Sequence, residues 1–273
     1  MNKSCSYSFE FPVVKETDVV VIGGGTAGCL AALSARRNGA DTSIIERESC
    51  LGGMTTGGFV NSFHTFRFSQ DYGSRNPASS WDSPLLVKGL SLEVVKRLQQ
   101  QGGTIDRGRP GEPSTRELFD PEIMKLVWDE MMEESRVEVL FNTFAVKAVT
   151  EGDALKGVVI ANKSGGQVVL GKVIIDASGD ADIAASAGVP FEVGREQDGR
   201  LHGGSLMMDV GGIDIHKLIS YLKSRPEKTI EERQKIEEES SRLLGGGKTR
   251  GTILSLDGKK GKFSHAGAAV QTP

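Results

Sequence analysis

An unbroken apolar run near the start of the chain leads directly into glycines. Residues 19–22 read VVVI, a β-branched pattern typical of a strand buried on both faces of a parallel sheet with helices on each side. Residues 29–40, CLAALSARRNGA, are rich in Ala and Leu and close with Asn-Gly, which predicts a helix with a C-terminal stop signal. Residues 42–45 predict a second short strand that ends at Glu46. This order within about thirty residues predicts one βαβ unit.

The turn between the first strand and the helix has the pattern G-x-G-x-x-G. Gly23 allows a tight turn, Gly25 lets the backbone approach a pyrophosphate, and Gly28 lets the helix pack against the strand. The helix follows directly, and a helix N-terminus attracts phosphate through free N–H groups and a partial positive charge. The turn therefore predicts a dinucleotide site.

Glu46 narrows the choice of dinucleotide. Its carboxylate follows the second strand, where it can accept hydrogen bonds from a ribose. An acid at this position disfavours a 2′-phosphate, so NAD or FAD is expected in preference to NADP. The alternative is a glycine-rich turn in an ordinary α/β protein, which explains the turn but not Glu46.

Composition and charge exclude several classes of protein. The 273 residues carry a net charge of −3 with no dominant basic patch, so a nucleic-acid partner is not indicated. Cys5, Cys29 and Cys50 form neither a C-x-x-C pair nor a metal-binding spacing, which suits a reducing compartment and predicts no metal site. No signal peptide and no membrane span are indicated. The expected location is the cytoplasm.

The first sixty residues also carry a family resemblance. Residues 18–60, DVVVIGGGTAGCLAALSARRNGADTSIIERESCLGGMTTGGFV, resemble the N-terminus of FAD-dependent oxidoreductases in the glutathione-reductase-like flavoprotein superfamily, specifically a family distantly related to fumarate reductase-type flavoproteins. The resemblance implies FAD, with NAD as the weaker alternative. It places the pyrophosphate at the first glycines, the adenosine ribose at Glu46, and the ribityl chain and flavin ring near the L-G-G-M-x-T turn. The residues implied to line FAD in this part are Gly23, Gly25, Thr26, Ala27, Gly28, Glu46, Arg47, Gly52, Gly53, Met54 and Thr55.

The resemblance continues downstream. Asp120-Pro121 is a good helix start, because Asp caps and Pro suits the first helical position. The strand after that helix implies adenine contacts near Ala145 and Val146. Residues 146–173 alternate short strands and turns and resemble the inserted three-stranded β-meander of such domains.

A later turn, ASGD, resembles the Ala-Thr-Gly turn that approaches the cofactor in these flavoproteins. It implies that Ala177, Gly179 and Asp180 lie near FAD. For Asp180, a simple helix N-cap is an equally good interpretation.

These observations predict an α/β protein. Its Rossmann-like FAD-binding domain spans 15–190, with a parallel sheet, the βαβ unit, the inserted meander and an insertion at 65–118. Residues 191–273 are expected to form part of a second domain, a substrate or cap domain. Related flavoproteins are much longer, and a late segment closes over their flavin. The resemblance therefore implies either an incomplete version of a longer protein or an oligomer or partner chain that completes the pocket.

The catalytic residues are not identified by the sequence. Disulfide reductases of this superfamily need a Cys pair that is not found here, and the flavin-tethering His of fumarate reductases has no counterpart before the glycine turn. The weak candidates are His64, Arg67 and His202, because imidazole suits proton transfer and Arg suits an anionic substrate. The expected function is hydride or electron transfer between FAD and an unidentified small molecule. The alternatives are a tRNA-modifying type of flavoprotein and a non-catalytic FAD-binding fragment.

Overall fold

A computed structural model describes residues 8–64, 66–67, 84–104, 113, 116–201, 204–205, 207, 214, 216–217, 220, 250–251 and 268–270. The chain divides into two compact units, Met1–Phe191 and Glu192–Pro273. Within the described ranges, no helix is both long and apolar enough to cross a membrane.

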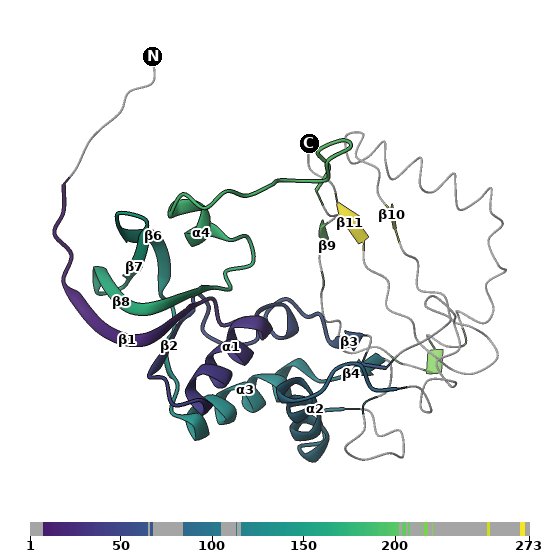
Figure 1. Cartoon of the computed structure of the whole chain (residues 1–273). Helices are drawn as coiled ribbons and strands as arrows, with labels where there is room; N and C mark the ends of the chain where they lie inside the picture. The colour runs from purple at the N-terminus through teal and green to yellow at the C-terminus, as the bar shows by residue number, and fades with distance from the viewer. Residues whose placement is uncertain are drawn as a thin grey trace. The chain divides into compact units, whose positions relative to one another are not determined.

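The first unit is built on a six-stranded sheet with the order β5-β2-β1-β8-β7-β6 (Figure 1). Its strands are β1 (Val13–Ile22), β2 (Thr42–Ile45), β5 (Glu138–Leu140), β6 (Phe144–Glu151), β7 (Ala154–Asn162) and β8 (Gly165–Asp176). Strands β5, β2, β1 and β8 are parallel, whereas β7 is antiparallel to both β8 and β6. The prediction of a βαβ unit on a parallel sheet followed by a three-stranded meander is confirmed.

Alternate residues of β1 face two different cores. Val19 and Val21 pack in one core cluster with residues of the helices α1 (Thr26–Arg37), α2 (Leu90–Gln100) and α3 (Pro121–Ser135). Val20 and Ile22 pack in the other cluster, with residues of the meander and of α4 (Asp182–Ser186). Burial on both faces is therefore as expected, but the second face is covered mainly by the meander and not by a layer of long helices.

The ends of the helices follow local sequence signals. Pro121 takes the first position of α3, and the Asp120 carboxylate accepts a hydrogen bond of 2.8 Å from the backbone N–H of Glu122. This is the predicted N-cap. Helix α1 ends at Arg37 with Asn38 as its C-cap residue, and Gly39 follows with a φ of +92°, a conformation that favours glycine.

The meander folds back toward the carboxyl ends of the parallel strands. Strands β5 and β6 lie at opposite edges of the sheet order, yet only residues 141–143 separate them. The backbone N–H of Thr143 donates to the carbonyl of Glu46 at 2.9 Å. The start of β6 is therefore held beside the end of β2.

The region predicted as an insertion begins and ends at a two-stranded ribbon. Strand β3 (Ser62–His64) pairs antiparallel with β4 (Arg116–Leu118). Between them, α2 places Val94 and Leu98 in the core cluster shared by the helices. In the second unit, β9 (Gly204–Ser205), β10 (Arg250–Gly251) and β11 (Ala268–Val270) form a small sheet of order β10-β11-β9.

Candidate functional site

Two glycine turns meet at the carboxyl end of β1. Gly25 and Gly52 form a parallel bridge, and the N–H of Gly52 donates to the carbonyl of Gly24 at 2.8 Å. A Cβ built on Gly53 would lie 3.1 Å from the Cα of Gly25. The first turn and the single 3₁₀ turn η1 (Gly53–Thr55) therefore form one continuous backbone surface, which we call the glycine cradle (Gly23–Gly28 and Gly52–Thr55).

Packing inside the protein requires glycine at several positions of the first turn. Gly23 has a φ of +91°, and a Cβ there would collide with the carbonyl of Ala177 on the neighbouring strand end. A Cβ on Gly28 would collide with the carbonyl of Gly23. Gly24, which was not among the predicted site residues, lies against the side chains of Leu51 and Glu46. Close backbone packing explains these glycines without any ligand.

Gly25 differs from these glycines. Its backbone is extended, with φ −65° and ψ 177°, which any residue can adopt. A Cβ there would meet nothing within 4 Å. Neither conformation nor packing within the protein calls for glycine at this position, so the open space beside it is the part of the cradle that a ligand can fill.

The N-terminus of α1 opens at the same place. Gly25 is its N-cap residue; no side chain caps the helix, and its first turn contains no acidic residue. The first N–H groups of a helix have no partner within the helix and attract anions. The Thr26 hydroxyl lies 3.5 Å from the carbonyl oxygen of Gly52 and 3.3 Å from Thr55 Oγ1. These contacts join the helix start to the second turn.

Glu46 is buried, with 5% of its surface exposed, and organises the edge of the cradle. Its Oε2 accepts a hydrogen bond of 2.5 Å from the N–H of Gly24, and Oε1 accepts one of 2.7 Å from the N–H of Glu48. An ionised carboxylate has about four acceptor positions, so two protein donors leave capacity for a sugar hydroxyl. The predicted ribose contact stays a prediction that this geometry can accommodate.

The other residues predicted from the first sixty positions have different surroundings. Arg47 is exposed, and its Nε lies 3.3 Å from Glu48 Oε1. Met54 is 62% exposed, whereas Thr55 is buried and its hydroxyl donates to the carbonyl of Gly52 at 2.8 Å. Met54 can therefore contact a bound molecule, and Thr55 shapes the turn.

Ala145 and Val146, the predicted adenine contacts, lie at the start of β6. Because Thr143 is bonded to Glu46, Ala145 lies within about 7 Å along the chain of that anchored residue. Val146 falls in a β-bulge opposite β7 and is 55% exposed. The structure thus brings this segment toward the Glu46 side of the cradle.

The turn after β8 contains the remaining predicted cofactor residues. Ala177 donates its N–H to the carbonyl of Ile22 at 2.8 Å and packs beside the first turn, and Gly179 has a φ of +101° with open space around it. Asp180 is exposed. The interpretation of Asp180 as an N-cap is wrong, because the cap residue of α4 is Ala181, with a φ of +57° and no side-chain bond.

Asp176 supplies the carboxylate that Asp180 was expected to supply. Its Oδ2 accepts hydrogen bonds from the N–H groups of Ile183 at 2.9 Å and Ala184 at 2.8 Å, and Oδ1 accepts from the N–H of Ser178 at 3.1 Å. Partial burial acts to raise the pKa of Asp176, but the hydrogen bonds outweigh burial and keep that pKa below its usual value. The sequence signal was a carboxylate at the last strand residue, before a turn of small residues.

The structure describes the positions of two of the three catalytic candidates. His64 lies in β3 with Arg116 as its backbone partner. The Arg67 side chain is buried, and its Nε donates to the carbonyl of Pro113 at 2.8 Å. His202 lies outside the described residues.

The two described cysteines have unlike surroundings. Cys29 is fully buried and donates to the carbonyl of Gly24, and burial raises the pKa of its thiol far above the usual range. Cys50 is half-buried, with its Sγ 4.0 Å from the hydroxyl of Thr56. In the portion of the chain that is described, no cluster of His, Cys, Asp and Glu could hold a metal ion.

Comparison with known proteins supplies independent findings. The family model described as "FAD dependent oxidoreductase" matches residues 18–264. Dihydrolipoyl dehydrogenase of Bacillus subtilis (strain 168) is 30% identical over 92 residues, which is 34% of this chain and 19% of that protein. Digeranylgeranylglycerophospholipid reductase 3 of Methanosphaera stadtmanae is 54% identical over 39 residues, 14% of this chain and 10% of that protein. This chain therefore spans a fifth or less of the length of these relatives.

A solved structure is also similar. The crystal structure of THI4 from Thermovibrio ammonificans matches with a TM-score of 0.45 and 20% sequence identity, over 66% of this chain and 67% of that chain.

Proposed function

We propose, from the premise that this chain belongs to the FAD dependent oxidoreductase family, that the glycine cradle binds the pyrophosphate of FAD and that the flavin oxidises or reduces a small molecule. Family membership confirms the resemblance predicted from the sequence. It also decides the cofactor in favour of FAD over NAD. The substrate and the direction of electron flow stay open.

The observation that carries the proposal is the open space beside Gly25 at an uncapped helix N-terminus. Glycine is dispensable there for packing and conformation, whereas a ligand that approaches the backbone closely makes it necessary. The N–H groups at the start of α1, around Thr26 and Ala27, would donate to the pyrophosphate oxygens. The donors present thus fit a doubly charged phosphate linker.

The other residues have supporting roles in this proposal. Glu46 would accept hydrogen bonds from the adenosine ribose, and Ala145 and Val146 would contact the adenine. Met54, which is exposed, would lie against the ribityl chain or the flavin. Arg47, Gly179 and Asp180 stay candidates at the rim of the same site.

FAD supplies a ring that accepts or donates a hydride or electrons when it is bound. The chain itself would hold the cofactor, and the fixed backbone of the two turns would orient it. A proton donor to the substrate is still needed, and His64 is our candidate because imidazole titrates near neutral pH. Arg67 is a candidate for binding an anionic substrate, and His202 is a second candidate for proton transfer.

The first experiment is a visible absorption spectrum of the purified protein, with the cofactor released by heat and identified. We expect FAD in the wild-type protein and little or none in Gly25→Val, because the side chain fills the space beside the helix start. Ser34→Val is the matched control, since it introduces the same residue on the exposed side of α1, outside the glycine cradle. A Gly25→Val protein that retains the full FAD content would refute the proposed site.

A second candidate is a flavin-binding chain that does not catalyse turnover by itself. The small share of the curated relatives that this chain spans favours testing it. Anaerobic mixing with a panel of donors and with NADH or NADPH distinguishes the two functions. Bleaching of the flavin absorbance supports the enzyme, and an unreduced flavin with every donor supports the non-catalytic alternative.

Two further expectations belong to the proposal. The protein would act in the cytoplasm, and it would work either as an oligomer or with a partner chain that covers the flavin. Light scattering of the FAD-loaded protein tests self-association. The tRNA-modifying alternative finds no support in the net charge of −3.

A further inference from the structure

A small cavity lies among the helices, beside the glycine cradle. Its volume is about 190 Å³. Residues of α1, α2, α3 and the β3 region surround it, and Thr26 contributes its side chain. The apolar side chains that line it are Leu30, Phe63, Phe66, Val87 and Val94. The residues that line it include no charged side chain.

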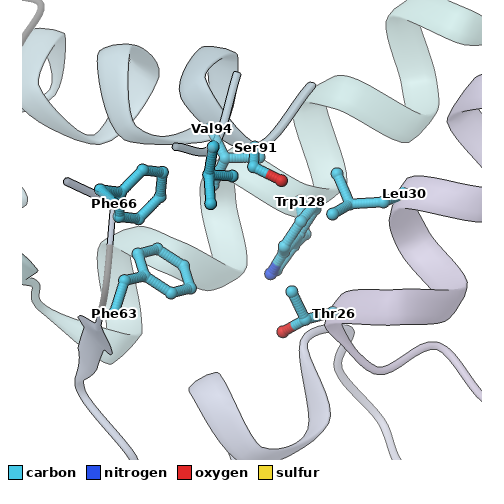
Figure 2. Close-up of a pocket in the computed structure, with 8 residues that line it drawn as sticks. Thr26, Leu30, Phe63, Phe66, Ser91, Val94 and Trp128 are labelled. Carbon is cyan, nitrogen blue, oxygen red and sulfur yellow. The ribbon is translucent and has the colours of Figure 1, made fainter. Parts of the chain in front are cut away.

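One polar group in this cavity is unusual. Trp128 is fully buried, and its indole Nε1 has no hydrogen-bond partner among the described residues. Figure 2 shows this nitrogen directed toward the side chain of Thr26, inside the pocket. A buried N–H without an acceptor costs about 1–3 kcal/mol, and most buried polar groups have a partner. The structure therefore leaves an unused donor in the wall of an apolar space.

The nearest polar groups are engaged with one another. The Thr26 hydroxyl lies near the Gly52 carbonyl and the Thr55 hydroxyl, and the Thr55 hydroxyl donates to that same carbonyl. Ion pairs hold the surrounding helices together, from Arg37 in α1 to Glu93 in α2 and from Arg97 in α2 to Glu134 in α3.

We propose that this cavity binds a neutral, ring-sized organic molecule that carries one acceptor oxygen. The indole N–H is a donor only, so the ligand must bring the acceptor. A charged ligand is disfavoured because no opposite charge lines the space. An apolar cavity of about 150 Å³ is large enough for benzene, which sets the scale for one six-membered ring.

The test is a titration followed by the ¹H–¹⁵N signals of the two tryptophan indoles. Trp128→Phe assigns its signal by removing it. Cyclohexanone should move the Trp128 indole proton downfield in a saturable way. Toluene, a ring of similar size without an acceptor, should bind without that downfield shift. In Trp128→Phe, monitored through backbone amides of α2, cyclohexanone should bind about five-fold more weakly while toluene binding is unchanged.

A second pair of variants tests the cavity itself. Ser91 lines it from α2, so Ser91→Leu should fill the space and abolish binding of both probes, whereas Ser91→Ala should preserve it. The proposal is overturned if cyclohexanone leaves the Trp128 signal unmoved, or if Ser91→Leu binds as well as wild type. Cross-relaxation of the indole proton with water, together with no response to either probe, would identify a hydration site and also overturn it. Because the measurement follows the indole, it is independent of whether FAD binds.

Discussion

Two strand-to-helix turns lie side by side in this protein, and they differ in how the first backbone N–H groups of the following helix are bonded. Strands β1 and β8 end in register, with Ile22 opposite Asp176. After β1, glycines bring the backbone close and α1 begins without a capping side chain. After β8, the carboxylate of Asp176 accepts hydrogen bonds from amides at the start of α4.

The difference teaches where an anion can bind. Both helix starts offer N–H groups at the same edge of the sheet, but a carboxylate of the protein already occupies those of α4. Those of α1 face open space beside Gly25. Both turns contain glycine in the sequence. The hydrogen bonds show that the N–H groups after the first turn are the ones that remain available to a ligand.

The largest expected effect is on the close backbone packing of the first turn. Gly28→Val would push a side chain into the carbonyl of Gly23, so the free energy of unfolding should fall by about 3 kcal/mol. Urea denaturation followed by circular dichroism measures it. Ser34→Val places the same residue on the exposed side of α1 and should change stability by less than about 0.5 kcal/mol. An equal loss of stability in both variants would show that the low helix propensity of valine, and not the close packing of the turn, causes the loss.

The second turn should depend on Asp176 and not on Asp180. Asp176→Ala leaves the amides of Ser178, Ile183 and Ala184 without their acceptor, which should cost about 2 kcal/mol. Asp180→Ala should cost less than about 0.5 kcal/mol, because Asp180 is exposed and caps nothing. Hydrogen exchange at Ile183 and Ala184 localises the effect, and a larger loss for Asp180→Ala would reverse our assignment of the cap.

Gly25→Ala should separate binding from stability. The extended backbone there accepts alanine. Alanine is a poorer N-cap residue than glycine, but the unfolded chain also loses conformational entropy, so the two effects offset and the free energy of unfolding should change by less than about 0.5 kcal/mol. The methyl group nevertheless enters the space beside the helix start, and the dissociation constant for FAD should rise about ten-fold, or about 1.4 kcal/mol. Thermal unfolding and flavin fluorescence titration measure the two quantities. A loss of stability as large as that expected for Gly28→Val would mean that Gly25 has a packing role like that of Gly28.

The sequence predicted the first turn far better than the second. Short-range patterns determine the βαβ unit: the apolar run of β1, the glycine spacing and Glu46 all act within thirty residues. The meander was also predicted, because its turns are local. What local pattern could not show is that Ala177 packs on Gly23, or that Asp176 reaches seven and eight residues ahead to Ile183 and Ala184. The packing of Ala177 on Gly23 depends on the parallel pairing of β1 with β8, which joins segments more than 150 residues apart. The hydrogen bonds of Asp176 lie within one short segment, but they span more residues than the usual N-cap spacing of two or three.

Local sequence patterns also do not show what surrounds the catalytic candidates or the cavity. His64 and Arg67 are candidates because of their residue type and their position after a glycine turn. Trp128 is one of several buried apolar residues in α3. The proposed role of its indole N–H as a donor to a ligand depends on its placement beside Thr26 and Gly52, which come from a different part of the chain.

The smallest expected effect is a pH dependence confined to α4. The pKa of Asp176 is lower in the folded state than its usual value near 3.9. A lowered pKa stabilises the fold at pH values above the unfolded pKa, and that stabilisation is lost as pH falls through the folded pKa. The amide signals of Ile183 and Ala184 should therefore change in one step below pH about 3.9. That step should disappear in Asp176→Asn, which keeps an acceptor oxygen but cannot titrate. If the step persists in the variant, another carboxylate controls α4, and the contrast between the two helix starts would no longer rest on Asp176.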